Sequence, residues 1–202
     1  MGEAAIVVLL AAIIRRQKEA ERGMKSNVTS KSYSSSSRDN LVVFSSDQTH
    51  AIITKACMIL GITNHRLIKT KSSHNYAMQA ADLRMAIEEK IAQGSVPLAV
   101  VATTGTTSSC AFDPLVEIGE VCQQYGNLWL LVDAAYGGAY ACLPELEYLF
   151  RGLNHADSFV VNCHKKLLCP FDLACMYVAD RCPTFSSARV PSQCSIRLQS
   201  SG

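Results

Sequence analysis

Short apolar runs alternate with amphipathic segments along most of the chain. A run of four or five apolar residues between turn-forming residues is typical of a buried strand. Strands are therefore predicted at residues 41–44, 98–102, 128–132, 158–161 and 174–178, and a weaker strand at 66–69, where only two residues are apolar. Because helical patterns separate most of these runs, we predict an α/β fold with a mainly parallel sheet and helices on both faces.

The helical segments show a period of 3.6 residues or recognisable ends. Residues 3–22 form the first, with an apolar first half and a charged second half. Other helices are predicted from the cap residues 45–47 to about residue 60, and over residues 82–92, 114–125 and 144–152. In the helix predicted over residues 82–92, Leu83, Ile87 and Ile91 are expected on one buried face.

Two segments lack either pattern. Gly23 and the serine-rich stretch that follows it are typical of a linker or loop. The last 22 residues are rich in Pro, Ser, Arg and Gln, which indicates a disordered tail. The predicted organisation is a helix at residues 1–22, a linker at 23–40, a folded core at 41–180 and the tail at 181–202.

Composition and charge narrow the function classes. The chain has 202 residues and a net charge of +2, which is too small to indicate binding to nucleic acid or to an anionic membrane surface. The apolar stretch at residues 6–14 is shorter than the roughly 20 residues of a membrane span. Its flanking charges, Glu3 before it and Arg15 after it, are the reverse of a secretory signal. No nucleic-acid or membrane partner is expected.

The nine cysteines bear on the compartment. Their number is odd, and no Cys-x-x-Cys pair occurs. Cys163, Cys169 and Cys175 recur every six residues, a spacing that matches no usual set of metal ligands. Neither a disulfide framework nor a metal site is predicted, and reduced thiols in the cytoplasm fit the pattern better.

Candidate chemistry follows two of the predicted strands. Lys165 ends the motif Asn162-Cys163-His164-Lys165 after one apolar run, and Asp133 directly follows another. Open α/β sheets bind ligands at the carboxyl ends of their strands. A lysine and an aspartate at such positions suit pyridoxal 5'-phosphate, whose aldehyde condenses with the lysine and whose ring nitrogen pairs with the aspartate. The simpler alternatives are a solvated lysine and a capping aspartate.

Two weaker features point to the same cofactor. The flat ring of His50 could stack on a pyridine ring, opposite a face covered by the small Ala135. The hydroxyl-rich run at residues 103–109 follows a predicted strand and could donate hydrogen bonds to phosphate or substrate oxygens. The alternatives are a surface histidine near a helix cap and an ordinary polar turn.

Taken together, four motifs resemble those of a known family. They are SDQTH at residues 46–50, ATTGTT at 102–107, VDAAY at 132–136 and NCHK at 162–165. In this order they are similar to the group II pyridoxal-phosphate-dependent decarboxylases, and most similar to the plant tyrosine and tryptophan decarboxylases. The resemblance implies a truncated fold-type I, transferase-like large domain, with residues 41–180 as its cofactor-binding core.

The resemblance also implies the roles of individual residues. Lys165 corresponds to the Schiff-base lysine, Asp133 to the partner of the ring nitrogen, and His50 to the histidine stacked on the ring. These three are the expected catalytic residues, and Ala135 corresponds to the residue on the opposite ring face. The other expected cofactor-binding residues are Thr103, Asn162, His164 and Gly2. The implied cofactor is pyridoxal 5'-phosphate, without a metal.

The chain departs from the family at several positions. Gly2 stands where the family has a phosphate-binding serine, Lys166 replaces a usual tryptophan, and Pro170 has no counterpart. Family members are roughly twice as long. We therefore expect this chain to lack an N-terminal segment and a C-terminal domain that the family carries.

The implied activity is decarboxylation of an aromatic L-amino acid to the aromatic amine and CO2, by an enzyme that is a homodimer in the full-length family. Oxidative conversion to an aldehyde stays open. The alternative is a catalytically inactive remnant that associates with full-length relatives. A nucleotide-binding module is disfavoured, because no Gly-x-Gly-x-x-Gly or Gly-x-x-x-x-Gly-Lys loop follows a predicted strand.

Overall fold

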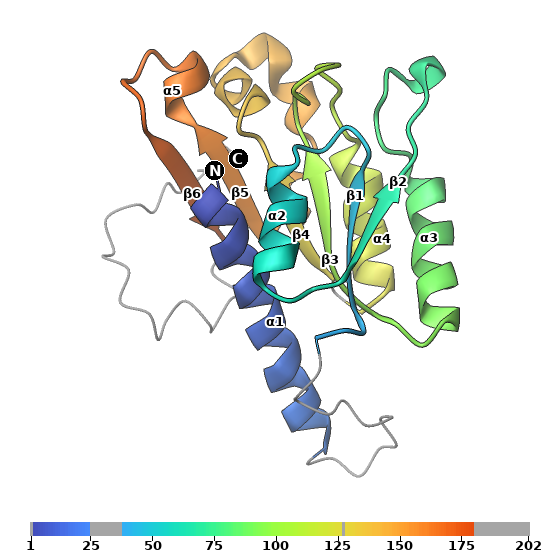
Figure 1. Ribbon diagram of the computed structural model, residues 1–202. Helices are drawn as coiled ribbons and strands as arrows, with labels where there is room; N and C mark the ends of the chain where they lie inside the picture. Colours follow the sequence, from blue (N-terminus) through green and yellow to red (C-terminus); the bar gives the residue numbers. More distant parts are fainter. Residues whose placement is uncertain (1, 25–37, 127, 180–202) are drawn as a thin grey trace, which may run out of the picture.

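Six strands form one sheet in the order β2-β1-β3-β4-β5-β6. The computed structural model describes residues 2–24, 38–126 and 128–179 (Figure 1). The strands are β1 Leu41–Ser46, β2 Asn64–Ile68, β3 Val96–Thr103, β4 Trp129–Asp133, β5 Ser158–Asn162 and β6 Ala174–Val178. All neighbouring pairs are parallel except β5 and β6, which are antiparallel. The predicted, mainly parallel sheet is confirmed.

Helices cover both faces of this sheet, as the alternation predicted. The α-helices are α1 Gly2–Met24, α2 Ile52–Ile59, α3 Ala80–Ala92, α4 Leu115–Gln124 and the single turn α5 Cys163–Lys166. Short 3-10 helices are η1 Ser72–His74, η2 Gly137–Cys142, η3 Pro144–Phe150 and η4 Leu153–His155. The helices α1 and α2 lie on one face, and α3 and α4 lie on the other (Figure 1).

Successive residues of a strand point to opposite faces of the sheet and pack into two separate hydrophobic cores. Val43 and Val101 pack under α1 and α2, whereas Phe44 and Val100 pack under α3 and α4. Because side chains alternate along a strand and both faces are covered, apolar residues are favoured at every position of the central strands. This double burial explains why β1, β3 and β4 appear in the sequence as continuous apolar runs instead of alternating ones.

Helix α1 is tied to the sheet by a polar contact. The guanidinium of Arg15 pairs with the carboxylate of Asp157 and lies 4.6 Å from the ring centre of Trp129. The other oxygen of Asp157 accepts the N–H of Leu130 at 2.8 Å. The helix therefore runs across the sheet in a fixed position, with Gly2 close to Ile52 at the start of α2.

Several predicted boundaries are wrong. The strand β1 continues through Ser46, and α2 begins only at Ile52, because Asp47 is held outside the helix by its N–H bond to the Ile68 carbonyl and by Thr70, whose hydroxyl donates to its carboxylate. The helix predicted at residues 144–152 is the 3-10 helix η3.

Two other predictions need correction. Ile91 is 46% exposed although Leu83 and Ile87 are buried. Eight residues at 3.6 per turn leave Ile91 about 80° around the helix from Leu83, and therefore off the buried face. The predicted linker starts too early, because α1 runs to Met24. The rest of that linker up to residue 37, and the predicted tail, lie outside the described residues.

Candidate active site

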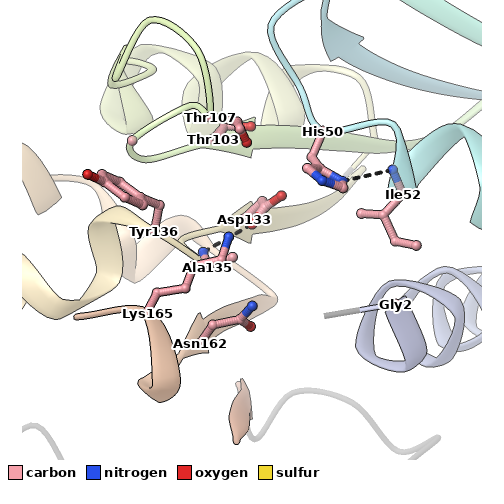
Figure 2. Close-up of a pocket in the computed structure, with 11 residues that line it drawn as sticks. Gly2, His50, Ile52, Thr103, Thr107, Asp133, Ala135, Tyr136, Asn162 and Lys165 are labelled. Atoms are coloured by element: carbon pink, nitrogen blue, oxygen red, sulfur yellow. Dashed lines mark hydrogen bonds between the residues drawn. The ribbon is translucent and has the colours of Figure 1, made fainter. Parts of the chain in front are cut away.

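A cavity of about 240 Å³ opens at the carboxyl ends of β3, β4 and β5. Seven of the eight residues predicted to bind the cofactor line it: Gly2, His50, Thr103, Asp133, Ala135, Asn162 and Lys165 (Figure 2). They come from five separate segments of the chain. We refer to this space as the strand-end cavity. Parallel strands deliver their carboxyl ends to one edge of the sheet, which is why residues distant in sequence meet here.

Asp133 is the buried charge of the strand-end cavity. It is the last residue of β4 and only 3% exposed. Burial raises the pKa of its carboxyl group, while the N–H of Ala135, at 3.1 Å, and the positive charges of Lys165 and His50 lower it. The net direction is upward, because removal from water disfavours the charged form. A cation placed beside this carboxylate would therefore be stabilised.

Lys165 enters the cavity from the single turn α5 that follows β5 (Figure 2). Consecutive residues of a helical turn point about 100° apart. Its two neighbours consequently point elsewhere. The amine of Lys166 lies 4.5 Å from the ring centre of Tyr136 and 5.7 Å from that of Tyr140, and hydrogen bonds to these phenols raise its pKa. Of the two lysines, Lys165 is the one that lines the cavity.

His164 is the predicted cofactor-binding residue that the cavity does not include. Its ring lies 4.9 Å from the ring of Phe171, and its Nδ1 is within hydrogen-bonding distance of the backbone of Leu173. The ring thus faces the loop between α5 and β6 instead of the strand ends. Its role in cofactor binding stays a prediction that this geometry does not support.

Asn162 presents an unused acceptor. It ends β5 and is 4% exposed, and its Oδ1 has no hydrogen-bond partner within the described part of the chain. An unsatisfied buried acceptor is costly and calls for an explanation. Since Asn162 lines the cavity, a ligand with an N–H or O–H group would supply the missing donor.

His50 lies on the opposite side, in the turn before α2. Its Nδ1 accepts the N–H of Ile52 at 3.1 Å (Figure 2). Because Nδ1 accepts this bond, the ring orientation is set by the start of the helix. The side chain is exposed, so the flat face of the ring is available to a molecule in the cavity.

Thr103 is positioned by a carboxylate that sequence reasoning missed. Asp113 is 2% exposed, and its two oxygens accept the N–H groups of Thr103 and Met78, both at 2.7 Å. Burial raises its pKa to about 6, although both hydrogen bonds lower it. The sequence does show an aspartate followed by a proline just before a helix, but this pattern is equally typical of a residue that caps the helix.

Two glycines bring the loops after β3 and β4 into contact. A Cβ on Gly137 would lie 2.3 Å from the carbonyl oxygen of Thr104, and one on Gly105, where φ is +82°, would lie 2.9 Å from Gly137 N. The N–H of Gly137 donates to that same carbonyl at 3.0 Å. This close approach places Tyr136 in the cavity wall, a residue not predicted for the site. Ile52 also lines the cavity and was not predicted, whereas Gly105 and Thr107 belong to the hydroxyl-rich run at residues 103–109 that was considered as a set of donors.

Comparisons with known proteins identify the family of this chain. The family described as the pyridoxal-dependent decarboxylase conserved domain matches residues 1–190. The chain is 42% identical over 181 residues to tyrosine decarboxylase 2 of Arabidopsis thaliana, covering 89% of this chain and 31% of that protein. It is 46% identical over 143 residues to the aromatic-L-amino-acid decarboxylase of Mus musculus, covering 71% of this chain and 29% of that protein.

A solved structure is similar over the same extent. The crystal structure of Oryza sativa TDC with PLP superposes with a TM-score of 0.79 at 33% identity, over 89% of this chain and 36% of that one. The expected fold-type I domain is confirmed. The chain spans about a third of the length of the curated relatives that it matches. Within the part of the chain that the structure describes, no helix is both long and apolar enough to cross a membrane.

Proposed function

The chain belongs to the family of pyridoxal-dependent decarboxylases, and on this premise we propose that it is the cofactor-binding core of an enzyme that decarboxylates an aromatic L-amino acid. The observation that carries the proposal is that Lys165 and Asp133, an amine and a buried carboxylate, line one cavity. The matched relatives are named as decarboxylases of tyrosine and of aromatic L-amino acids, which supports the substrate class.

The residues of the strand-end cavity suit pyridoxal 5'-phosphate. The buried acceptor of Asn162 lacks a donor, and the buried carboxylate of Asp133 accepts the backbone N–H of Ala135, so a polar, cationic ring would supply a donor to the first and a charge to the second. His50 would cover one face of the ring and Ala135 the other. Thr103 would offer its hydroxyl to the cofactor's oxygens.

When bound, pyridoxal phosphate supplies the electron sink for the bond that breaks at the substrate α-carbon. Lys165 would bind the cofactor covalently through Nζ and would yield that position to the substrate amine. Asp133 would hold a proton at the ring nitrogen, because its buried carboxylate stabilises a cation at that atom. His50 and Ala135 would hold the ring between them and so fix its orientation relative to Lys165.

Trapping the cofactor on a lysine tests the proposal. The purified chain is incubated with pyridoxal phosphate and reduced with borohydride, and the labelled peptide is identified by mass spectrometry. We expect the adduct on Lys165, its loss in Lys165→Ala, and its retention in the matched variant Lys166→Met. Equal labelling of both lysines, or labelling of surface lysines alone, would contradict the proposed site.

Product analysis separates the proposed enzyme from the alternative. Tyrosine, tryptophan and DOPA are each offered to the loaded chain, and CO2, the amine and any aldehyde are measured. Release of an aromatic amine supports decarboxylation, and release of an aldehyde supports the oxidative variant of the chemistry. An adduct on Lys165 without either product would favour a remnant that binds the cofactor and associates with longer relatives.

We further propose that the protein acts as a homodimer in the cytoplasm. The described cysteines are free thiols, which is consistent with a reducing compartment. Light scattering on the purified chain, alone and mixed with a full-length relative, would measure its assembly. A monomer under both conditions would contradict the proposed dimer.

A further inference from the structure

Two thiols lie beside the segment that carries Lys165. Cys163 opens α5, two residues before that lysine, and Cys175 lies on the neighbouring strand β6. Their sulfur atoms are 3.5 Å apart. Cys163 is 8% exposed, whereas Cys175 is partly exposed. No step of the proposed reaction uses either thiol.

The sheet register explains why the two thiols meet. In the antiparallel pair of β5 and β6, Val161 lies opposite Cys175. Cys163 is two positions beyond Val161, and therefore diagonal to Cys175 across the two strands. Diagonal neighbours are usually further apart, but the chain turns into α5 at Cys163 and brings the sulfur inward. The backbone therefore sets the contact between the two sulfur atoms, at the end of β5, where Asn162 also lies.

We propose that Cys163 and Cys175 form a reversible disulfide by exchange with a low-molecular-weight disulfide, which makes this pair a modification site at the base of the cofactor lysine. The inference about the disulfide is independent of the proposed function. Its consequence for Lys165 rests on that function.

The exchange takes place in two balanced steps. The thiolate of Cys175 attacks one sulfur of the small disulfide, whose S–S bond breaks, and a mixed disulfide and one small thiol result. The thiolate of Cys163 then attacks the sulfur of Cys175, forms the internal S–S bond and releases the second small thiol. The protons of the two cysteines end on the two small thiols. The cysteine pair loses two electrons, and the small disulfide gains them.

The order of these steps follows from exposure. Burial and the neighbouring Cys175 raise the pKa of the Cys163 thiol to about 11, so little of it is thiolate near neutral pH. Cys175 is the more accessible of the two and reacts with the external disulfide first. Cys163 is then the resolving thiol, because its sulfur already lies next to the mixed disulfide.

Closing the bond would change the presentation of Lys165. A disulfide holds its sulfurs at about 2.05 Å, so the two atoms must approach by roughly 1.5 Å. Because Cys163 begins α5, this movement draws the single turn toward β6. Misplacement of a reacting group by about 1 Å lowers rates by up to roughly 100-fold. We expect covalent trapping of pyridoxal phosphate on Lys165 to slow by about tenfold in the oxidised chain.

The test uses oxidised glutathione as the small disulfide. The whole chain, without pyridoxal phosphate, is incubated with it, free thiols are blocked by alkylation, and peptides are mapped by mass spectrometry. We expect a peptide cross-linked between Cys163 and Cys175 that disappears after treatment with dithiothreitol. Glutathione carried only by the exposed Cys110 and Cys142, or a mixed disulfide at Cys175 that never resolves, overturns the proposal.

Two variants act as matched controls. Cys175→Ser removes the partner and must abolish the cross-link. Cys169→Ser removes the third cysteine of this region and must leave the cross-link intact. A bridge that maps to Cys169, or that is lost in Cys169→Ser, overturns the assignment.

Borohydride trapping on Lys165 is then compared in the reduced and oxidised chain. Equal rates overturn the proposed effect on the lysine. An absence of trapping in the reduced chain is instead a failure of the proposed function, and the cross-link, read by mass alone, is judged separately.

Discussion

Two buried aspartates near the strand-end cavity differ in what they bind: Asp133 ends β4, and Asp113 lies in the loop before α4. The strand residue Thr103 lies opposite Asp133 in the sheet, and its N–H donates to Asp113. Asp113 uses both oxygens on backbone N–H groups of its own chain. Asp133 accepts one backbone N–H and faces Lys165 and His50 across the cavity. Equal burial therefore does not imply an equal role. The carboxylate with both oxygens bonded holds a loop, and the other is available to a ligand.

The two pKa values respond to different neighbours. Burial raises both, but Asp113 is opposed only by fixed backbone donors, whereas Asp133 is opposed by a backbone donor and by the charges of Lys165 and His50. Backbone donors do not change when a ligand binds. The charges around Asp133 do, so its protonation is coupled to what occupies the cavity.

The largest expected effect is the loss of cofactor affinity in Asp133→Asn. Removing one member of a buried charge pair costs about 3–5 kcal/mol, which corresponds to a dissociation constant for pyridoxal phosphate that is higher by roughly two to four orders of magnitude. Equilibrium dialysis measures this constant. An affinity unchanged from that of the wild type would show that Asp133 does not pair with the ring.

The next effect is a pH dependence of stability due to Asp113. Its folded pKa of about 6 lies above the usual value of about 3.9, so the folded state binds the proton more tightly. The stabilisation is fully present below pH 3.9 and is lost as the pH rises through 6, by about 3 kcal/mol. Urea unfolding of the wild type and Asp113→Asn between pH 4 and 7 tests this. A difference between the two that does not decrease with pH would refute it.

The smallest expected effect is that of substituting a third carboxylate, Asp157, which lies outside the strand-end cavity. Asp157 resembles Asp113, since one oxygen accepts the N–H of Leu130 and the other pairs with Arg15. Asp157→Asn removes the ion pair and should lower the free energy of unfolding by about 1–3 kcal/mol. Dialysis should give an unchanged affinity for pyridoxal phosphate. A large loss of affinity here would mean that bonding of both oxygens does not separate structural from ligand-binding carboxylates.

Local pattern accounts for much of what was predicted correctly. Apolar runs identified the central strands β1, β3 and β4, because both faces of the sheet are covered there. The edge strand β2 has the sequence NHRLI and was predicted from a shorter apolar segment. Lys165 and Asp133 were predicted from their positions just after two of those runs. The start of α2 was missed because the Asp47 N–H and side chain bond to Ile68 and Thr70, residues that no local pattern links to it.

The parts of the site that were missed depend on contacts between distant segments. Asp113 reads in sequence as a cap, and only its bond to the Thr103 N–H connects it to the cavity. Tyr136 joins the wall because Gly105 and Gly137 let two loops touch. The role of His164 was implied by the resemblance to the family and stays a prediction, since its ring faces the loop between α5 and β6.

By itself, the amino-acid sequence determined the succession of strands and helices along the chain and the burial of the sheet on both faces. It also determined that an amine and an acid follow buried strands. Those features follow from side-chain period and burial, which are local properties of the chain. Only the tertiary structure decided that Lys166 packs on Tyr136 instead of entering the cavity, that Asp113 holds Thr103, and that two cysteines meet beside Lys165. Each of these depends on the direction of a side chain relative to a distant segment, and packing across the sheet sets that direction.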